Sequence, residues 1–336
     1  MAKASLSKPV QVGVVIVAAG LVLLAAVWQL VLGGYILTAT RWDPDFTVSP
    51  DGLTVVFVGA GDGVTDLKSL RLPSGSITRL TKSPDLELSP AFSADGRWVY
   101  YAHRRGPRSG GGLRRCGADG ANDGPVTSPK RPLADTAPSC SPDGRHLVFL
   151  RSGRRAQRST GGVGWYDWAS WLLDLRDGSE RRLAVREPDG ATKAVDGACF
   201  AGRSDSVVDV RVSLDAADLP AGFTVWRIGL DGRQESVATM REKAFEVRVS
   251  PDGRSVVYCA DADEPFRPEV WLARLDGSPS RRLTHLSSRC SLPQVSLDGA
   301  WVYFVREYSG RAIWRVASSG GEPTEVVPPA AVDGRG

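Results

Sequence analysis

A short turn of the form Ser-x-Asp-Gly recurs five times along the chain and constrains its fold more than any other feature. The copies begin at Ser49, Ser93, Ser141, Ser250 and Ser296, and their glycines lie 44, 48, 109 and 46 residues apart. A degenerate copy at 198–208 fills the long gap. Repeats of about 50 residues with four strand-like runs each are typical of propeller blades. The sequence therefore predicts an all-β, six-bladed β-propeller of four-stranded antiparallel blades.

The residues of the turn explain why it recurs. Proline presets φ at the second position, Asp suits the third, and Gly adopts the left-handed conformation that closes a hairpin. The opening Ser can bond to the backbone amides of its own turn. A second turn follows about 20 residues later in each repeat, at Ser74-Gly75, Asp119-Gly120, Asp177-Gly178, Asp231-Gly232, Asp276-Gly277 and Gly320-Gly321. Each repeat thus predicts a meander of strands a, b, c and d, which must stack on its neighbours around an axis.

The repeats carry a further motif at the end of strand d, seen as Arg79-Leu80-Thr81 and Arg281-Arg282-Leu283-Thr284. With the Ser-Pro-Asp-Gly turns, this motif makes residues 44–328 resemble the TolB-like, WD-like propeller repeat family. The resemblance implies the fold, and it implies a role in protein binding or, as in prolyl-oligopeptidase-like enzymes, a propeller beside a hydrolase domain. The chain departs from both, because we find neither an α/β domain before the repeats nor a hydrolase domain after them. Propellers serve many functions, so the resemblance does not define one.

The N-terminal segment predicts where the propeller resides. Residues 10–32 are almost wholly apolar, and as a helix they would extend about 35 Å, enough to cross a hydrocarbon core of roughly 30 Å. The run is longer than the apolar part of a cleavable signal peptide, which favours an uncleaved signal anchor. Lys3 and Lys8 precede it, so the positive-inside rule places the N-terminus in the cytoplasm and the propeller in the periplasm or outside the cell. The predicted division is a cytoplasmic N-terminus, a transmembrane helix, a linker, the propeller and a C-terminal tail, at 1–9, 10–32, 33–43, 44–328 and 329–336.

Composition and cysteine usage exclude some classes of function. The formal charge of +4 is small, and no nucleic-acid recognition motif is present. Five cysteines include no C-x-x-C pair, and an odd number cannot all pair within one chain. Cys140 and Cys259 take positions held by apolar residues in sister repeats, so we interpret them as buried and apolar. A disulfide between Cys116 and Cys140 remains an alternative in an oxidising compartment.

The sequence contains no assembled catalytic set. Neither a Gly-x-Ser-x-Gly elbow nor a His-Glu-x-x-His motif occurs, and His103, His146 and His285 are far apart. The glycine-rich segment 59–63 lies between two strands, so we interpret it as a hairpin loop and not as a phosphate cradle. The acidic segment 261–264 is interpreted as a solvated loop, with calcium binding as the alternative. We therefore predict no catalytic residue, no metal and no cofactor, with metal binding by His103 and His285 as a weaker alternative.

One cluster of residues suggests a binding surface. In a meander blade the a–b and c–d turns lie on one face, here named the turn face, and the b–c loops and d–a connectors lie on the other, the loop face. The b–c loops of blades two and three are long and basic, and these blades are neighbours. The candidate patch consists of Arg104, Arg105, Arg108, Arg114, Arg115, Arg151, Arg154, Arg155, Arg158, Trp165, Tyr166 and Trp168. Such a patch favours an anionic partner: an acidic glycan, a phosphate polymer, lipid head groups or an acidic protein. The alternative is that these are solvated loops, and that Trp171 packs in strand c as Trp226, Trp271 and Trp314 do.

These observations together predict a non-enzymatic, membrane-anchored propeller that binds a protein or an envelope polymer on the extracytoplasmic side. A hydrolase or lyase acting on such a polymer is the first alternative. A sensory domain of a membrane complex is the second, although the predicted cytoplasmic segment is short for signalling. The oligomeric state and the way the ring closes stay open.

Overall fold

The computed structural model describes residues 45–60, 65–105, 110–130, 133–152, 168–183, 192–194, 198–214, 220–262, 267–286, 288–308 and 310–333. The chain divides into two compact units, Met1–Asp43 and Pro44–Gly336, and all described residues belong to the second. The predicted anchor at 10–32 and its linker lie outside the described residues. Within the described ranges, the structure contains no helix of the length and apolar character that a bilayer span requires.

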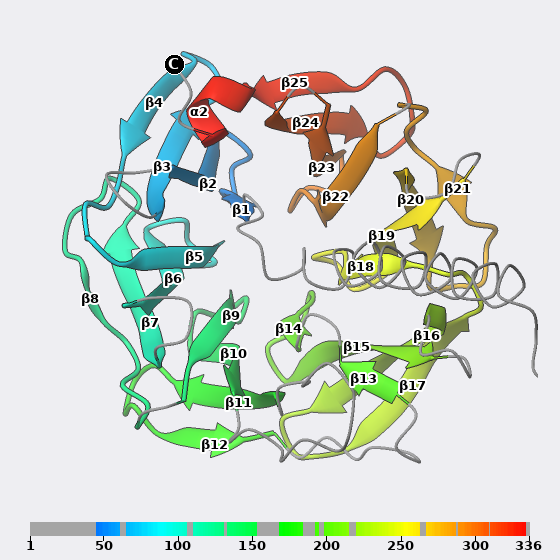
Figure 1. The fold of residues 1–336 in the computed structure, drawn as a ribbon. Helices are drawn as coiled ribbons and strands as arrows, with labels where there is room; N and C mark the ends of the chain where they lie inside the picture. The colour runs from blue at the N-terminus through cyan, green and yellow to red at the C-terminus, as the bar shows by residue number, and fades with distance from the viewer. Residues whose placement is uncertain are drawn as a thin grey trace, which may run out of the picture. The chain divides into compact units, whose positions relative to one another are not determined.

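The described strands follow one another in chain order as units around a common centre, with four strands in each unit except the fourth, which has five (Figure 1). The first two units are β1 to β4 (Phe46–Val48, Thr54–Ala60, Thr65–Arg71, Ser76–Arg79) and β5 to β8 (Leu86–Phe92, Trp98–Arg104, Gly111–Gly117, Gly124–Pro125). The third unit is β9 to β12 (Asp135–Cys140, His146–Ser152, Trp168–Asp174, Glu180–Arg182). The fourth is β13 to β17 (Thr192–Ala194, Cys199–Phe200, Ser206–Leu214, Pro220–Gly229, Gln234–Met240). The last two are β18 to β21 (Phe245–Val249, Ser255–Asp261, Pro268–Arg274, Arg281–Arg282) and β22 to β25 (Arg289–Val295, Trp301–Glu307, Arg311–Ala317, Thr324–Val327).

The all-β propeller fold is thus confirmed, but the hydrogen bonding differs from the six separate sheets that the sequence predicts. The described strands form five sheets, of eight, four, five, four and four strands. The eight-stranded sheet contains the first two units, which are joined by one parallel pair between Thr65 of β3 and Leu86 of β5. The remaining pairs in that sheet are antiparallel. The prediction missed the merger because a single contact between neighbouring units leaves no mark on the repeat pattern.

The turns have the chemistry that the sequence predicts. In the last copy, the Ser296 hydroxyl donates to the Asp298 carboxylate at 2.6 Å and accepts a bond from the Trp301 amide at 2.9 Å. Asp298 also accepts a bond from the Ala300 amide at 3.0 Å, and Gly299 has a φ of +71°. The other four copies repeat these three bonds. The hydrogen bonds that Asp298 Oδ1 accepts from the Ser296 hydroxyl and the Ala300 amide lower the pKa of Asp298 below its usual value.

The innermost strands contain a feature that the sequence did not predict. Ser89, Ala137, Glu246 and Leu292 have φ between 50° and 52°, and each lies at a bulge in β5, β9, β18 or β22. A left-handed conformation is costly for a residue with a Cβ atom. Bonds between units involve three of these four residues: the Leu292 amide donates to the Glu246 carboxylate, and the Ser89 and Thr136 hydroxyls lie 3.2 Å apart.

The hydrophobic core is divided into clusters that lie between neighbouring units. Strand β2 shows why: Val56 and Val58 pack with Val99 and Tyr101 of the next unit, whereas Phe57 packs on the other side. Alternate residues of a strand point to opposite faces of its sheet, so an almost continuous apolar run makes both faces apolar. Each of the six clusters joins two such units.

One cluster joins the last unit to the first. Phe57 of β2 packs with Tyr303 of β23 and with Val332, which is 2% exposed. Val332 belongs to α2 (Pro329–Asp333), a short helix within the segment that the sequence assigned to a C-terminal tail. The Asp333 carboxylate accepts bonds from the amide and guanidinium of Arg311, at 3.1 and 3.0 Å. The ring therefore closes through side-chain packing and α2, and not through a shared sheet.

Replacing Val332 with Ala should lower the free energy of unfolding by about 1–3 kcal/mol, because buried methyl groups are removed from the closing cluster. Urea unfolding measures the change. The matched control is Ala330→Ser, an exposed position on the same helix, which should stay within about 0.5 kcal/mol of the wild type. Equal stability of the Val332→Ala variant and the wild type would contradict closure through α2.

Candidate functional site

The structure places part of the predicted patch on strands instead of loops. Arg104 is the last residue of β6, Arg114 and Arg115 lie within β7, Arg151 lies within β10, and Trp168 begins β11. Only the backbone of Trp168 is described, and Arg105 directly follows β6. The remaining patch residues lie outside the described residues: Arg108, Arg154, Arg155, Arg158, Trp165 and Tyr166. The prediction of an anionic partner for the whole patch stays a prediction.

Arg114 takes part in a pairing within its own unit. Its guanidinium donates to both carboxylate oxygens of Asp123, at 3.1 and 3.0 Å. The Tyr101 hydroxyl donates to the same carboxylate at 2.7 Å. A bidentate pair of this kind fixes the guanidinium in one orientation. Arg114 therefore stabilises β7 against the following turn, and this function in the fold explains its presence.

Arg151 is the centre of a buried network between the second and third units. Its guanidinium makes two bonds to Asp135, at 2.6 and 2.8 Å, and one to Glu180 at 2.6 Å. Asp135 is fully buried and also accepts a 2.6 Å bond from the Thr127 hydroxyl, which in turn accepts the Leu113 amide. A buried carboxylate without such a partner would be strongly destabilising. Arg151 is therefore held by contacts within the fold, and its role in binding a partner stays a prediction.

Tryptophans on the third strands are packed by arginines from the second strands. The distance from the guanidinium carbon to the centroid of the indole ring is 4.6 Å for Arg151 and Trp171, 4.7 Å for Arg306 and Trp314, and 5.6 Å for Arg211 and Trp226. Trp271 instead donates its indole N–H to the Ala260 carbonyl oxygen. The four indoles occupy the same register position, opposite an equivalent residue of the second strand. This confirms the alternative in which Trp171 packs in its sheet. Arg115 similarly lies over the Trp98 ring, at 4.4 Å.

Among the described residues, three exposed cations lie at the loop-face end of the β5–β8 unit. Lys82 lies in the connector between β4 and β5, Arg105 follows β6, and Lys130 lies in the connector between β8 and β9. The pairs Thr65–Leu86 and Gly111–Ala134 place both connectors beside the starts of the third strands, which is the loop face. We name these three residues the basic sector.

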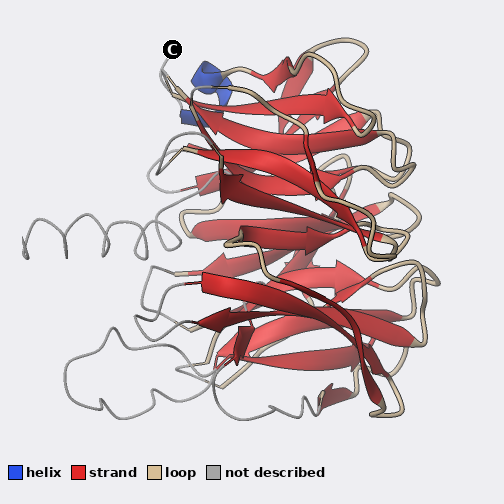
Figure 2. Ribbon diagram, turned by 90° about the vertical axis from the view of Figure 1, so that its right-hand side faces the viewer, coloured by secondary structure: helices blue, strands red, loops and turns tan. Residues whose placement is uncertain are grey.

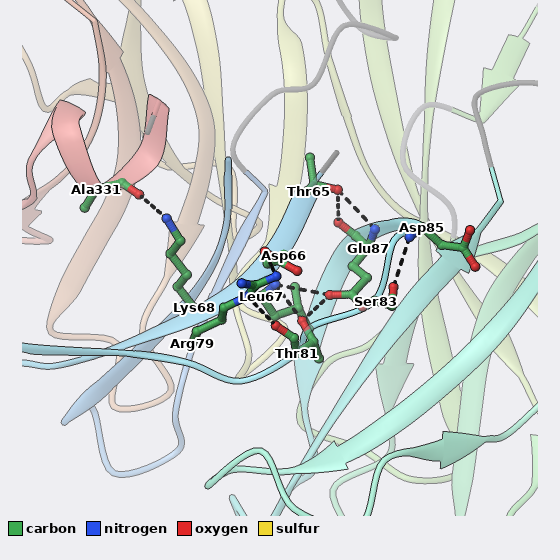
Figure 3. Close-up of polar contacts among 10 residues, drawn as sticks. All are labelled: Thr65, Asp66, Leu67, Lys68, Arg79, Thr81, Ser83, Asp85, Glu87 and Ala331. Atoms are coloured by element: carbon green, nitrogen blue, oxygen red, sulfur yellow. Dashed lines mark hydrogen bonds and ion pairs between the residues drawn. The ribbon is translucent and has the colours of Figure 1, made fainter. Parts of the chain in front are cut away.

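Beside the basic sector lies a buried polar cluster between the first two units (Figure 3). Glu87 of β5 accepts bonds from the Thr81 hydroxyl and from the Leu67 amide, and its backbone bonds to Thr65. Asp66 of β3 forms an ion pair with Arg79, with 2.7 Å between Nη2 and Oδ2. Both carboxylates are 1% exposed. The cluster thus couples the Arg-Leu-Thr motif of one unit to the first strand of the next.

The pairing of buried acids with arginines at this junction differs from the pairing at two equivalent places in the propeller. Between the second and third units, Arg151 pairs directly with the carboxylate that Thr127 binds. In the fifth unit, Thr284 donates to Glu269, which also pairs with Arg282 at 3.4 Å. In the first junction, Arg79 pairs with Asp66, and Glu87 is an additional buried acid. Burial is the main cause that raises the pKa of Glu87 above its usual value, and the nearby Asp66 carboxylate adds to the effect.

The other predicted candidates are not brought together. His103 pairs with Asp85 at 3.2 Å, and burial lowers the pKa of His103 despite that carboxylate. The described residues contain no group of three or more His, Cys, Asp or Glu side chains suited to a metal ion. The segment 59–63 is described only at Gly59 and Ala60. All five cysteines are described as free thiols, so the structure does not contain the alternative disulfide between Cys116 and Cys140.

Comparison with known proteins supports the fold and leaves the activity open. No protein-family model matches the chain. Uncharacterized protein Atu1656 of Agrobacterium fabrum is 25% identical over 185 residues, which are 55% of each chain, so the match spans about half the length of that relative. TolB from Acinetobacter baumannii is 16% identical with a TM-score of 0.61, covering 84% of this chain and 66% of that chain. An oligogalacturonate lyase in complex with manganese is 18% identical with a TM-score of 0.57, covering 84% of this chain and 76% of the lyase.

A putative TolB from Agrobacterium tumefaciens is a further structural neighbour, 17% identical with a TM-score of 0.54, covering 76% of this chain and 86% of that chain. All three identities are below 25%, so the likeness shows the propeller fold alone. The neighbours include TolB proteins and a lyase, and the function of this chain must be argued from its own residues.

Replacing Arg151 with Ala should lower the free energy of unfolding by about 3–5 kcal/mol, because Asp135 would keep a buried charge without its cation. The control is Arg145→Ala, an exposed arginine of a nearby turn, which should change stability by less than about 0.5 kcal/mol. Urea unfolding of both variants gives the comparison. A stable Arg151→Ala variant would return this residue to the list of partner-binding candidates.

Replacing Glu87 with Gln should change how stability depends on pH. A carboxyl whose folded pKa is raised binds its proton more tightly when folded, so its contribution favours the folded state at low pH and declines as pH rises from about 4.5. The variant has no such group. Its free energy of unfolding relative to wild type should therefore increase as pH rises above about 4.5. Glu322→Gln, at an exposed turn, should run parallel to wild type; parallel curves for Glu87→Gln would contradict a raised pKa of Glu87.

Proposed function

We propose that this protein is a membrane-anchored, extracytoplasmic propeller that binds an anionic protein or envelope polymer without chemical turnover. In this proposal residues 10–32 form the anchor, and the eight-stranded sheet counts as two blades, which gives a six-bladed ring. The TolB-like and lyase propellers among its structural neighbours are compatible with a binding module, and they supply the fold on which the argument rests.

The exposed basic sector is the observation that carries the proposal. Lys82, Arg105 and Lys130 lie at the loop-face end of one unit, whereas Arg114 of that unit and Arg151 of its neighbour are held in ion pairs. The interior pairs fix the strands that carry this sector, so binding an anion would mainly require ordering of the exposed side chains themselves. The sequence places further arginines in the loops between β6 and β7 and between β10 and β11, which would extend the same surface.

The enzymatic alternative depends on Glu87. A carboxyl with a raised pKa is a common feature of a general acid. Glu87 is 1% exposed, however, and is bonded to Thr81 and Leu67, so a polymer could reach it only after the first two units separate. Its position at a junction between units supports a structural function. Turnover of acidic oligosaccharides by the purified protein would favour the enzyme instead.

Reversing the charge at Arg154 and Arg155 should weaken capture of an anionic partner without lowering the melting temperature. The matched control is the double variant Arg145→Glu and Arg254→Glu, which changes the same number of charges at exposed positions of the turn face. Crosslinking in intact cells, followed by identification of what co-purifies, measures capture. Equal capture by both double variants and the wild type would remove the loop-face patch from the proposal.

A further inference from the structure

A cavity of about 360 Å³ lies between the third and fourth units, at the turn face. It is lined by the first residue of β10, the last residue of β11, the start of β12, and Leu230 in the c–d turn of the fourth unit. In the side view, most described turns lie along one edge of the sheets (Figure 2). Two lining residues, Ser179 and Arg181, are exposed, so the cavity can be reached from solvent. Its volume is at the lower end of the range for ligand pockets, which suits one small molecule.

Two sister units fill the equivalent place with a stacked pair of side chains. In the second unit, the guanidinium carbon of Arg115 lies 4.4 Å from the centroid of the Trp98 ring. In the sixth unit, the guanidinium carbon of Arg315 lies 4.2 Å from the centroid of the Trp301 ring. Each pair combines the first residue of the second strand with an arginine of the third strand.

The third unit has His146 and Leu172 at these two positions. The His146 amide donates to the serine that opens its turn, as the amides of both tryptophans do. Leu172 pairs with the third residue of the second strand, as both arginines do. Histidine and leucine side chains have less volume than tryptophan and arginine side chains. In a structure that is otherwise close-packed, this smaller pair leaves the space that forms the cavity.

The polar groups of the cavity offer both donors and acceptors. His146 Nε2 lies 3.8 Å from Asp174 Oδ2, which is too far for a hydrogen bond, so neither group satisfies the other. The buried His146 Nδ1 has no hydrogen-bond partner in the described part of the chain. Arg181 Nη2 donates to the Leu230 carbonyl oxygen of the fourth unit at 2.6 Å. A guanidinium carries five N–H donors, so Arg181 can also donate to a ligand.

The charges around the cavity favour a neutral ligand. Glu180 pairs with Arg151 at 2.6 Å. Asp174 pairs with the Arg176 guanidinium at 3.4 Å and accepts the Arg176 amide at 2.9 Å. Because both acids are already paired, a cation would find no free carboxylate charge, and an anion would face two carboxylates. The two leucines of the lining add an apolar wall.

We propose that this cavity binds one ring of a neutral sugar. The hydroxyl groups of the ring bond to His146, Asp174 and Arg181, and its C–H face packs against Leu172 and Leu230. A few placed polar groups beside apolar side chains are the usual construction of a small-molecule site. The inference goes beyond the proposed function, because it depends neither on the anchor nor on the basic sector, which lies at the loop face.

The test follows the imidazole nitrogens of the full chain by NMR, with the methyl glycosides of glucose, galactose and mannose as probes. The chain contains three histidines, and a His146→Gln variant assigns the signals of His146. We expect at least one sugar to shift these signals to saturation and to leave those of His103 and His285 unchanged. No shift with any of the three sugars, or equal shifts of all three histidines, would overturn the inference.

Variants connect the signal to the cavity, with saturation transfer from protein to sugar as the measure of binding. His146→Trp introduces the indole of the sister units and should abolish binding without lowering the melting temperature. Arg181→Ala should weaken binding about tenfold, because a charged donor is lost. The matched control is Arg281→Ala. Arg281 has the same register in the fifth unit and donates to the Ser318 and Ser319 carbonyl oxygens of the next unit. Equal affinity of the two alanine variants would overturn the inference.

Charged analogues test the class of ligand. The uronate and the amino derivative of the sugar that binds should bind about tenfold more weakly, because each brings an unpaired charge. Tighter binding of either analogue would assign the cavity to a charged ligand and overturn the neutral assignment. A linear trisaccharide of the same sugar distinguishes the end of a glycan chain, which should bind at least as tightly, from a free monosaccharide; either result keeps the assignment. Failure of these tests leaves the capture experiment on the loop-face patch unaffected.

Discussion

The apolar character of both faces of each sheet is the constraint on which the structure depends. In β2, Val55 and Phe57 pack on one side while Val56 and Val58 pack on the other. A sheet of this kind exposes one apolar face unless a neighbour covers it, so each unit needs two neighbours. The chain satisfies that requirement only by returning to its start, where Phe57 meets Tyr303 and Val332. Closure is thus a consequence of strand composition, and α2 supplies the last covering residues.

Buried charges determine how the units are joined, because a buried carboxylate must be paired. Thr81, Thr127 and Thr284 each accept a backbone amide of a third strand and donate to a buried acid. Arginines that neutralise such acids cannot also bind a partner. This explains why Arg151 belongs to the fold although its sequence neighbours are candidates for recognition. The junction between the first and second units differs, because it contains two buried acids, Asp66 and Glu87, and Arg79 pairs with Asp66.

The two faces of the propeller are built from different kinds of connection. Short turns with a fixed hydrogen-bond pattern repeat on one face, and connectors of variable sequence lie on the other. Loops on a rigid scaffold carry recognition because they change without disturbing the core. The basic sector lies on the connectors, next to rigid ion pairs, and the chain enters from the same face. The proposed binding surface rests on this position and on the exposed charge of the basic sector.

The sequence by itself determined the strands, the turns and the propeller, because Ser-x-Asp-Gly chemistry and apolar alternation are local properties that each repeat displays. It also predicted a basic rim, but it could not tell loop arginines from strand arginines, since the register of β7 and β10 defines that boundary. Only the tertiary structure decided that Arg114 and Arg151 are paired, that Glu87 and Asp66 share a junction, and that α2 closes the ring. The left-handed residues at Ser89, Ala137, Glu246 and Leu292 were likewise decided by tertiary structure. Each of these depends on contacts between residues distant in sequence, where the free energy of burial and pairing outweighs local preference.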